Sequence, residues 1–165
     1  MKKPTQKSRV HRQAGFTLIE LILVIAIIII IAAAIFVALN PAKRLGDAND
    51  SRRWSDVNQT LSAVHQYVVD NKGAFPNSGT WTSGVNFVLG TAGSGCNTTC
   101  TAVATQAACL NLSDLVTNNY IGAIPADPVT GTAANTDYYV SRNPGGIVTI
   151  GACDPYSASP IKVMR

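Results

Sequence analysis

The chain has 165 residues and a formal net charge of +4 at pH 7, and 47% of its residues are hydrophobic. The positive charge belongs to one end of the chain, because five basic residues and no acidic residue precede Gly15, namely Lys2, Lys3, Lys7, Arg9 and Arg12. The rest of the chain holds eight Lys/Arg and nine Asp/Glu, a net charge of −1. Global basicity often indicates nucleic-acid binding, but a short basic leader does not support that class, so DNA is an unsupported partner.

A long apolar segment follows the leader. Residues 16–39 number 24, and only Thr17 and Glu20 among them are polar. As a helix this segment would extend for about 36 Å, which exceeds the roughly 30 Å of a bilayer's hydrocarbon core. We therefore predict a transmembrane helix over 16–40. Because the basic residues precede it, the positive-inside rule places the N-terminus in the cytoplasm and the remaining chain outside.

Two simpler explanations of this segment stay open. A secretory signal peptide has a shorter apolar region of about 7–15 residues, although Ala38 would serve as a poor cleavage site. A plain signal anchor would explain the hydrophobicity. Neither explains why Glu20, the only glutamate of the chain, lies at the entrance of the apolar run.

The order of features around Glu20 is specific. A basic leader ends in Gly15, the residues Phe16-Thr-Leu-Ile-Glu20 follow, and an unbroken apolar run continues to Leu39. This arrangement resembles the class III signal of type IV pilins and pseudopilins. The resemblance implies that prepilin peptidase removes the leader 1–15 by cleavage after Gly15, and that the new N-terminal Phe16 is N-methylated. It also implies that the pilus assembly machinery polymerises the retained helix into a helical homo-oligomeric filament.

The position of Glu20 then has a physical explanation. An ionised carboxylate within a membrane helix costs several kcal/mol unless it is paired. Cleavage after Gly15 would create an ammonium group on Phe16, one helical turn from Glu20. In a helical bundle, Glu20 of one subunit would meet the Phe16 amine of its neighbour, and such buried pairs set register more than they add stability. The alternative is a carboxylate that extends to the aqueous interface.

The apolar helix is followed by Asn40 and Pro41, where we predict a bend or local melting over residues 40–46, with Gly46 as a second weak point. Helical periodicity then resumes over 41–72, as an amphipathic outer half that ends near Asn71 and Gly73. Its apolar stripe has spacings of 3 and 4 residues and consists of Trp54, Val57, Leu61, Val64 and Val68.

Charged residues of both signs crowd the start of this outer half. They are Lys43, Arg44, Asp47, Asp50, Arg52, Arg53 and Asp56. One interpretation is salt bridges between neighbouring subunits, and the other is a solvated helix face with charge pairs inside the helix.

Residues 73–165 are expected to form a globular head, since eleven of the thirteen glycines lie at or beyond Gly73. We predict a connecting loop with one small strand at Val85–Leu89, and a short helix capped by Ser113 that runs to about Asn119. A β-hairpin is predicted from Tyr138–Arg142 and Ile147–Gly151, joined by a type II turn at Asn143-Pro-Gly-Gly, with a further strand at Ile161–Met164. The predicted fold class is α+β, with a long N-terminal helix packed against a small antiparallel sheet, a layout similar to type IV pilins.

All four cysteines, Cys96, Cys100, Cys109 and Cys153, lie in the head. An even number beyond a membrane anchor favours disulfides, and four cysteines allow three pairings. We prefer Cys96–Cys100 with Cys109–Cys153, and buried free thiols are the alternative. A zinc site is not expected, because no C-x2-C pair or accompanying histidine is present.

One segment of the head carries a second, weaker resemblance. Ile124-Pro-Ala-Asp127-Pro128, followed by Gly131 and Tyr138-Tyr139, is similar to the Pro-x-Asp-Pro…Gly…Tyr segment of major pseudopilins and some Gram-positive pilins. In secretion pseudopilins a nearby loop binds calcium. The spacing of Asp127 and Asp137 matches no calcium loop, however, so no metal ligand is assigned. The alternative is that Asp127 stabilises a turn beside Pro128.

No catalytic set can be assembled. His65 is the only histidine beyond the leader, and the chain has no phosphate-binding glycine loop and no G-x-S-x-G motif. We therefore predict no enzymatic activity and no cofactor. The predicted function is a structural pilin, held in the cytoplasmic membrane and then polymerised outside it. The alternative is a minor pilin or pseudopilin of a type II secretion or DNA-uptake machine.

Overall fold

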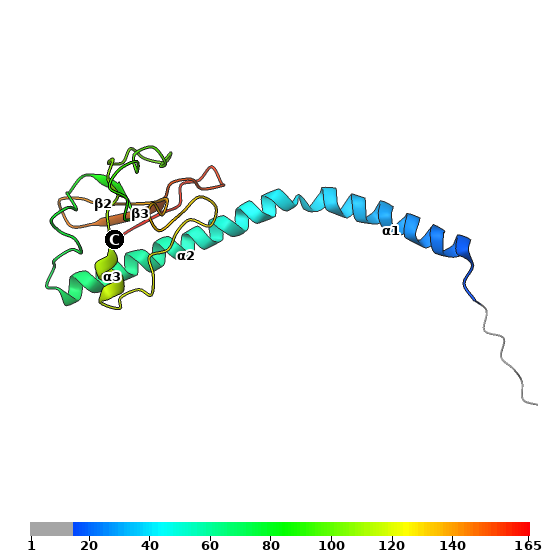
Figure 1. Cartoon of the computed structure of the whole chain (residues 1–165), viewed down its shortest axis with the longest axis horizontal. Coiled ribbons are helices and arrows are strands. Elements are labelled where there is room, and N and C mark those ends of the chain that lie inside the picture. Colours follow the sequence, from blue (N-terminus) through cyan, green and yellow to red (C-terminus); the bar gives the residue numbers. More distant parts are fainter. Residues whose placement is uncertain (1–14) are drawn as a thin grey trace, which may run out of the picture. The chain divides into compact units, whose positions relative to one another are not determined.

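The structure is a computed structural model that describes residues 15–165, so the expected leader, apart from Gly15, lies outside the described residues. It contains two compact units, one that ends at Pro41 and one that comprises Ala42–Arg165. Figure 1 labels helices and strands of the two units.

The first unit consists of helix α1, Leu18–Leu39, which is long and apolar enough to cross a membrane by length and composition. An 18-residue window within its 22 residues has a mean hydropathy of 3.5, and none of the 22 is buried. The helix ends at Asn40, which adopts a left-handed conformation with φ 41°. Asparagine tolerates this conformation at a helix C-terminus better than most residues. Proline at the next position can start a new helix, because the N–H group that it lacks would have no partner within the helix there.

Helix α2, Pro41–Asp70, follows at once. The predicted weak point at Gly46 is wrong, because Gly46 lies inside α2 and is buried. The ring of Tyr156 covers it, and a Cβ atom at Gly46 would lie only 2.3 Å from Cδ1 of that ring. Glycine is therefore present for close packing, and the helical interruption is confined to Asn40.

The head contains a four-stranded antiparallel sheet in the order β1-β2-β3-β4, with strands Asn86–Val88, Tyr138–Arg142, Val148–Ala152 and Lys162–Met164. The predicted small strand, hairpin and last strand are confirmed, as is the α+β fold class. The hairpin pairs Val140 with Ile150. Its predicted type II turn is wrong, because that turn requires a left-handed residue at Gly145, whereas the left-handed glycine is Gly146 with φ 85°.

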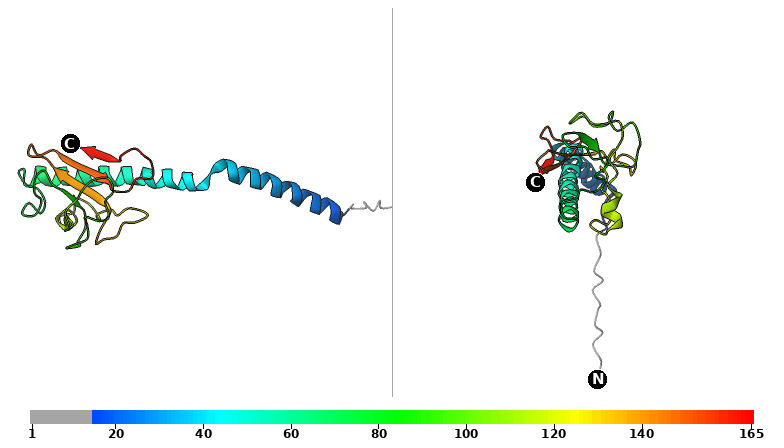
Figure 2. Two further views of the ribbon diagram at one scale, coloured as in Figure 1. Left: turned by 90° about the horizontal axis from the view of Figure 1, so that it is seen from above. Right: turned by 90° about the vertical axis from the view of Figure 1, so that its left-hand side faces the viewer.

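The sheet packs over one face of α2, as Figures 1 and 2 show. Val57, Leu61 and Val64 of the predicted stripe are buried, and Val68 is partly buried. Trp54, also predicted to face the core, remains 43% exposed, while its neighbour Arg53 is only 3% exposed. The prediction fails at this end because the head there presents the carboxylate of Asp127 to α2 rather than an apolar surface.

Helix α3, Ser113–Thr117, occupies the predicted short helical segment and buries Leu115. The predicted cap is wrong, because Leu112 holds the N-cap position and makes no side-chain cap bond. The Asn111 side chain substitutes for it by accepting a hydrogen bond from the Ser113 backbone N–H at 2.9 Å.

Candidate functional site

The first candidate site is the N-terminal end of α1. Thr17 is the N-cap residue, with φ −81° and ψ 151°, and its Oγ1 accepts a hydrogen bond from the Glu20 backbone N–H at 3.3 Å. Helices with Thr and Glu three residues apart at their start commonly use this capping-box pattern. The sequence analysis did not predict this cap, although the Thr17–Glu20 spacing is a signal for it. The cap begins the helix at Leu18, so the bond between Gly15 and Phe16 lies before the helix.

Glu20 lies in the first turn of α1, where a carboxylate interacts favourably with the positive end of the helix dipole. Phe16 is 86% exposed and lies only four residues before Glu20. From Leu21 to the end of α1 no charged residue occurs. The structure thus places the predicted processing position and the lone glutamate together at one end of an exposed apolar helix.

A second cluster lies where the head meets α2. Nε and Nη2 of Arg53 donate to the two carboxylate oxygens of Asp127 at 2.5 and 2.9 Å, and Nη1 donates to Asp50 at 2.8 Å. The side chains of Arg53 and Asp127 are 4% and 0% exposed. Asp50 also accepts hydrogen bonds from the backbone N–H groups of Tyr156 and Ser157. One arginine therefore connects α2 with two separate segments of the head.

The pKa values of this cluster favour its charged state. Desolvation acts to raise the pKa of Asp127, but hydrogen bonds from Arg53 and from the backbone of Val129 and Thr130 outweigh it and hold that pKa below 3.8. The pKa of Asp50 is lowered in the same way, with desolvation opposed by the backbone donors of the C-terminal loop and by Arg53. The pKa of Arg53 is raised, chiefly by its hydrogen bond with Asp127.

Sequence reasoning did not anticipate this cluster. Lys43–Asp47 and Arg52–Asp56 are pairs four residues apart on α2, at 3.7 and 3.9 Å, as the interpretation of a solvated face predicts. Arg53 pairs with Asp50 inside the helix, as the second interpretation predicts, but neither interpretation predicts its other partner, Asp127, which lies 74 residues away and in the same unit. The available signal was the position of Arg53 four and eight residues before Val57 and Leu61, which places it on the same face of the helix.

Asp127 stabilises the turn beside Pro128, since its Oδ1 accepts from the Val129 N–H at 2.8 Å. Its two oxygens are also engaged by Arg53, so they do not suit a calcium ion. Within residues 15–165, no group of three or more His, Cys, Asp or Glu side chains could hold a metal ion. Gly131 closes the same turn, where a Cβ atom would lie 2.2 Å from the Asp127 backbone nitrogen.

The preferred disulfide pairing is wrong. The structure pairs Cys96 with Cys109 and Cys100 with Cys153. Backbone hydrogen bonds from Cys96 to Ala107 and from Cys109 to Ala92 align two segments side by side, and this brings the first pair together. Cys153 lies directly after β3, where the Thr101 hydroxyl oxygen lies 3.1 Å from its carbonyl oxygen and 2.6 Å from the Asp154 carboxylate, so the loop with Cys100 is held against this segment. Short sequence spacing was therefore no guide to the pairing.

His65 lies on α2, and its Nε2 is buried without a hydrogen-bond partner among the described residues. The absence of catalysis remains a prediction.

Comparison with protein families places these N-terminal features in a known class. A family model described as the prokaryotic N-terminal methylation motif matches residues 10–36, which include Gly15, Phe16 and Glu20. Comparisons with curated proteins and with solved structures found no match. The chain therefore carries a prokaryotic N-terminal methylation motif at the start of its apolar helix, and the described residues beyond that helix form an α+β head.

Proposed function

We propose that the chain is a structural subunit of a type IV pilus or a related filament. In this proposal, prepilin peptidase removes the leader 1–15, Phe16 becomes the methylated N-terminus, and 16–40 is both the membrane anchor and the assembly helix. The amphipathic half 41–72 carries the head 73–165 outside the cytoplasmic membrane. The assembly machinery then transfers the subunit from lipid into an extracytoplasmic homo-oligomeric filament.

The observation that carries the proposal is the lone carboxylate of Glu20 at the start of an entirely exposed apolar helix. Burying a Leu or Ile side chain is worth about 1.5–3 kcal/mol relative to leaving it in water. A helix of 22 exposed residues, all apolar except Glu20 and most of them large, needs either lipid or other helices around it. Lipid would suit the stored subunit, and neighbouring copies of α1 would suit the filament.

Glu20 supports assembly in one register. The Phe16 ammonium group that cleavage would create lies one helical turn from the carboxylate, so both groups reach the headgroup region in a single subunit. In a filament the Phe16 amine of one subunit would pair with Glu20 of the next. An unpaired charge in the apolar interior is strongly unfavourable, so alternative axial positions of the subunits are disfavoured.

The mass of the subunit in filaments tests this proposal. Filaments sheared from cells are analysed by intact mass spectrometry and N-terminal sequencing. The expected dominant species begins at Phe16 and carries one additional methyl group. A full-length chain, or one that begins after Ala38, would contradict the proposal, because the first is unprocessed and the second has lost α1.

A second candidate function is a pseudopilin of a type II secretion machine. The similarity of Ile124–Pro128 and Gly131 to the corresponding segment of major pseudopilins favours it. Abundance distinguishes the two functions: a pilus subunit is the main component of long surface filaments, whereas deletion of a secretion pseudopilin abolishes export of enzymes. A DNA-uptake role would require salt-dependent DNA binding by the head, which the near-neutral charge beyond the leader does not favour.

A further inference from the structure

The head contains a buried carboxylate with an oxygen that lacks a donor. Asp137 precedes β2 and is only 2% exposed. Its Oδ2 accepts a hydrogen bond from the Thr130 hydroxyl, whereas its Oδ1 is buried and has no hydrogen-bond partner. A buried ionised oxygen without a partner is costly, and protonation is the usual way in which a protein avoids that cost.

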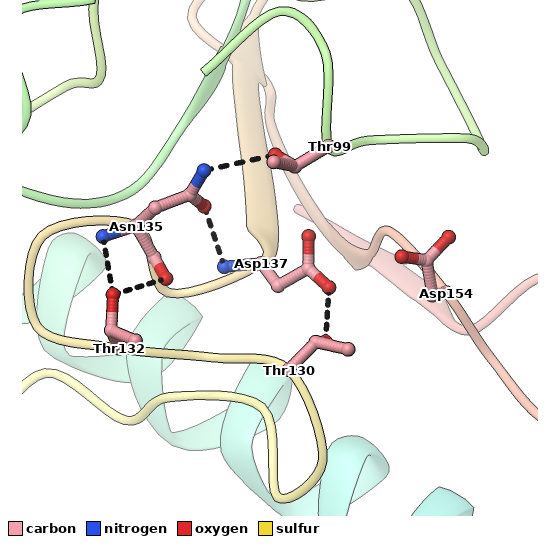
Figure 3. Close-up of a pocket in the computed structure, with 6 residues that line it drawn as sticks. All are labelled: Thr99, Thr130, Thr132, Asn135, Asp137 and Asp154. Atoms are coloured by element: carbon pink, nitrogen blue, oxygen red, sulfur yellow. Dashed lines mark hydrogen bonds between the residues drawn. The ribbon is translucent and has the colours of Figure 1, made fainter. Parts of the chain in front are cut away.

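Asp137 shares a cavity with a second carboxylate, that of Asp154. The cavity has a volume of about 320 Å3, and Figure 3 shows both side chains in its wall with Thr99, Thr130, Thr132 and Asn135. None of these lining residues carries a positive charge. Asp154 is fixed by the Thr101 hydroxyl, which donates to its Oδ1 at 2.6 Å. The two acids therefore face the same polar space without a cation between them.

Charged groups on the neighbouring elements do not neutralise the negative charges of Asp137 and Asp154. Asp127, in the adjacent loop, accepts a hydrogen bond from the Thr130 backbone N–H, so a third carboxylate lies beside Asp137. Arg53 on α2 is the cation that lines the adjoining pocket with Asp154, but its guanidinium already binds Asp127 and Asp50. If every group in this cluster were ionised, four carboxylates would surround one guanidinium.

We propose that Asp137, whose carboxylate faces that of Asp154 across the cavity, is protonated in the folded head, and that loss of this proton loosens the C-terminal loop, residues 153–160, from the head. This inference concerns the folded subunit and does not depend on filament formation. Burial raises the pKa of Asp137 above its ordinary value of 3.8, the hydrogen bond from Thr130 opposes this effect, and the carboxylates of Asp154 and Asp127 raise the pKa further. The raised pKa of Asp137 and its buried Oδ1 without a donor both favour the protonated acid.

The C-terminal loop links the pair to α2. Asp154 lies directly after Cys153, whose backbone N–H donates to the Asp137 carbonyl at 3.0 Å. Two and three residues later, the backbone N–H groups of Tyr156 and Ser157 bind Asp50 on α2. The Tyr156 ring also covers Gly46. Repulsion between two ionised carboxylates would act at the start of this loop and weaken its attachment to α2.

The sign of the pH dependence follows from linkage. Asp137 binds a proton more tightly in the folded than in the unfolded chain, so stability falls as pH rises from 3.8 through the folded pKa and is constant above it. Each pH unit by which a pKa is raised changes the folding equilibrium constant by about tenfold. Asp137→Asn removes the titrating group. Asparagine is suitable here because it tolerates the left-handed backbone at this position, φ 63°.

The test uses the full chain in detergent micelles, with denaturant unfolding followed by fluorescence of the buried Trp81. The wild type is expected to lose stability between pH 3.8 and neutral pH, and Asp137→Asn to lose markedly less over the same interval. Asp154→Asn should also reduce the slope. The control Asp47→Asn removes an exposed carboxylate on α2 and should keep the wild-type slope. Equal slopes in wild type and Asp137→Asn would overturn the proposal.

Two further measurements keep the proposal testable if a variant fails to fold. NMR titration of the aspartate side-chain carboxyl carbons in the wild type should show one group with a pKa well above 3.8, and its absence would overturn the proposal. Hydrogen exchange of residues 153–160, corrected for the intrinsic effect of pH, should increase as that group ionises. If calcium chloride instead removes the pH slope, the pair binds a cation rather than a proton, and the proposal is wrong.

Discussion

Arg53 of α2 binds both carboxylate oxygens of Asp127, which lies 74 residues further along the chain. Both side chains are buried, so this ion pair joins the long helix to the head where apolar packing has ended. The same guanidinium holds Asp50, which in turn accepts two backbone hydrogen bonds from the C-terminal loop. Arg53 therefore binds the Asp127 loop directly and contacts the C-terminal loop only through Asp50.

Loss of Arg53 should destabilise the head strongly. Arg53→Met leaves the Asp127 carboxylate buried without its partner, which typically costs about 3–5 kcal/mol. The free energy of unfolding in denaturant, measured with the full chain in micelles, checks this value. The neighbouring variant Arg52→Met is the control, because Arg52 is exposed and its pair with Asp56 should be worth less than about 1 kcal/mol. Similar effects of the two substitutions would contradict the assigned role of Arg53.

Acid should destabilise the same cluster. The folded pKa values of Asp50 and Asp127 are lowered, so their stabilising contribution is fully present above 3.8 and is lost as pH falls through the folded values. This dependence is opposite in sign to that of Asp137. Unfolding experiments below pH 3.8 should show a steep loss of stability in the wild type. In Asp127→Asn the loss should be smaller, and an unchanged slope would exclude Asp127 as the titrating group.

The two disulfides should differ in their contribution to stability. Cys100–Cys153 joins residues 53 positions apart, and Cys96–Cys109 joins residues 13 positions apart. In the chain-entropy model a longer closed loop constrains the unfolded chain more, here by about 1 kcal/mol. Replacing Cys100 and Cys153 by alanine should therefore cost more than replacing Cys96 and Cys109.

Peptide mapping without reduction checks the pairing itself. A digest should contain a peptide that joins Cys100 to Cys153. A peptide in which Cys109 is linked to Cys153 would contradict the observed pairing.

The carboxylate of Glu20 should be required for assembly and not for insertion. Glu20→Gln removes the charge but keeps the size of the side chain, so the subunit should accumulate in the membrane and lose its leader normally. Filaments should be absent or strongly reduced, because no pair with the neighbouring Phe16 amine forms. Membrane fractionation and quantification of sheared filaments measure the two steps. Glu20→Asp, which keeps the charge, should retain part of the assembly, whereas normal filaments from Glu20→Gln would refute the proposed role.

The N-cap at Thr17 can be tested separately from Glu20. Thr17→Val removes the hydroxyl that accepts the Glu20 backbone N–H while it keeps the branched shape, and loss of an N-cap usually costs about 0.5–2 kcal/mol of helix stability. Amide exchange of Leu18–Glu20 in micelles should increase in this variant. Thr17→Ser retains the acceptor and should exchange as the wild type does.

The sequence by itself determined the elements whose evidence is local. The apolar run after Glu20, the two strand segments on either side of Asn143-Pro-Gly-Gly and the spacing of Val57, Leu61 and Val64 are each signals carried by neighbouring residues. Those features predicted the membrane-length helix, the hairpin and the face of α2 that packs against the sheet. The N-terminal methylation motif was recognised in the same way, because it is contiguous in the sequence.

Only the tertiary structure decided which distant residues meet. The disulfide partners, the pair Arg53–Asp127 and the two acids Asp137 and Asp154 are each brought together by the path of the loops around the sheet. That path results from the packing of the whole head, and a side chain's burial depends on what lies opposite it rather than on its own polarity. For this reason Trp54 stays exposed while Arg53 is buried. Charge pairs and buried acids could not be assigned until the opposing surfaces were known.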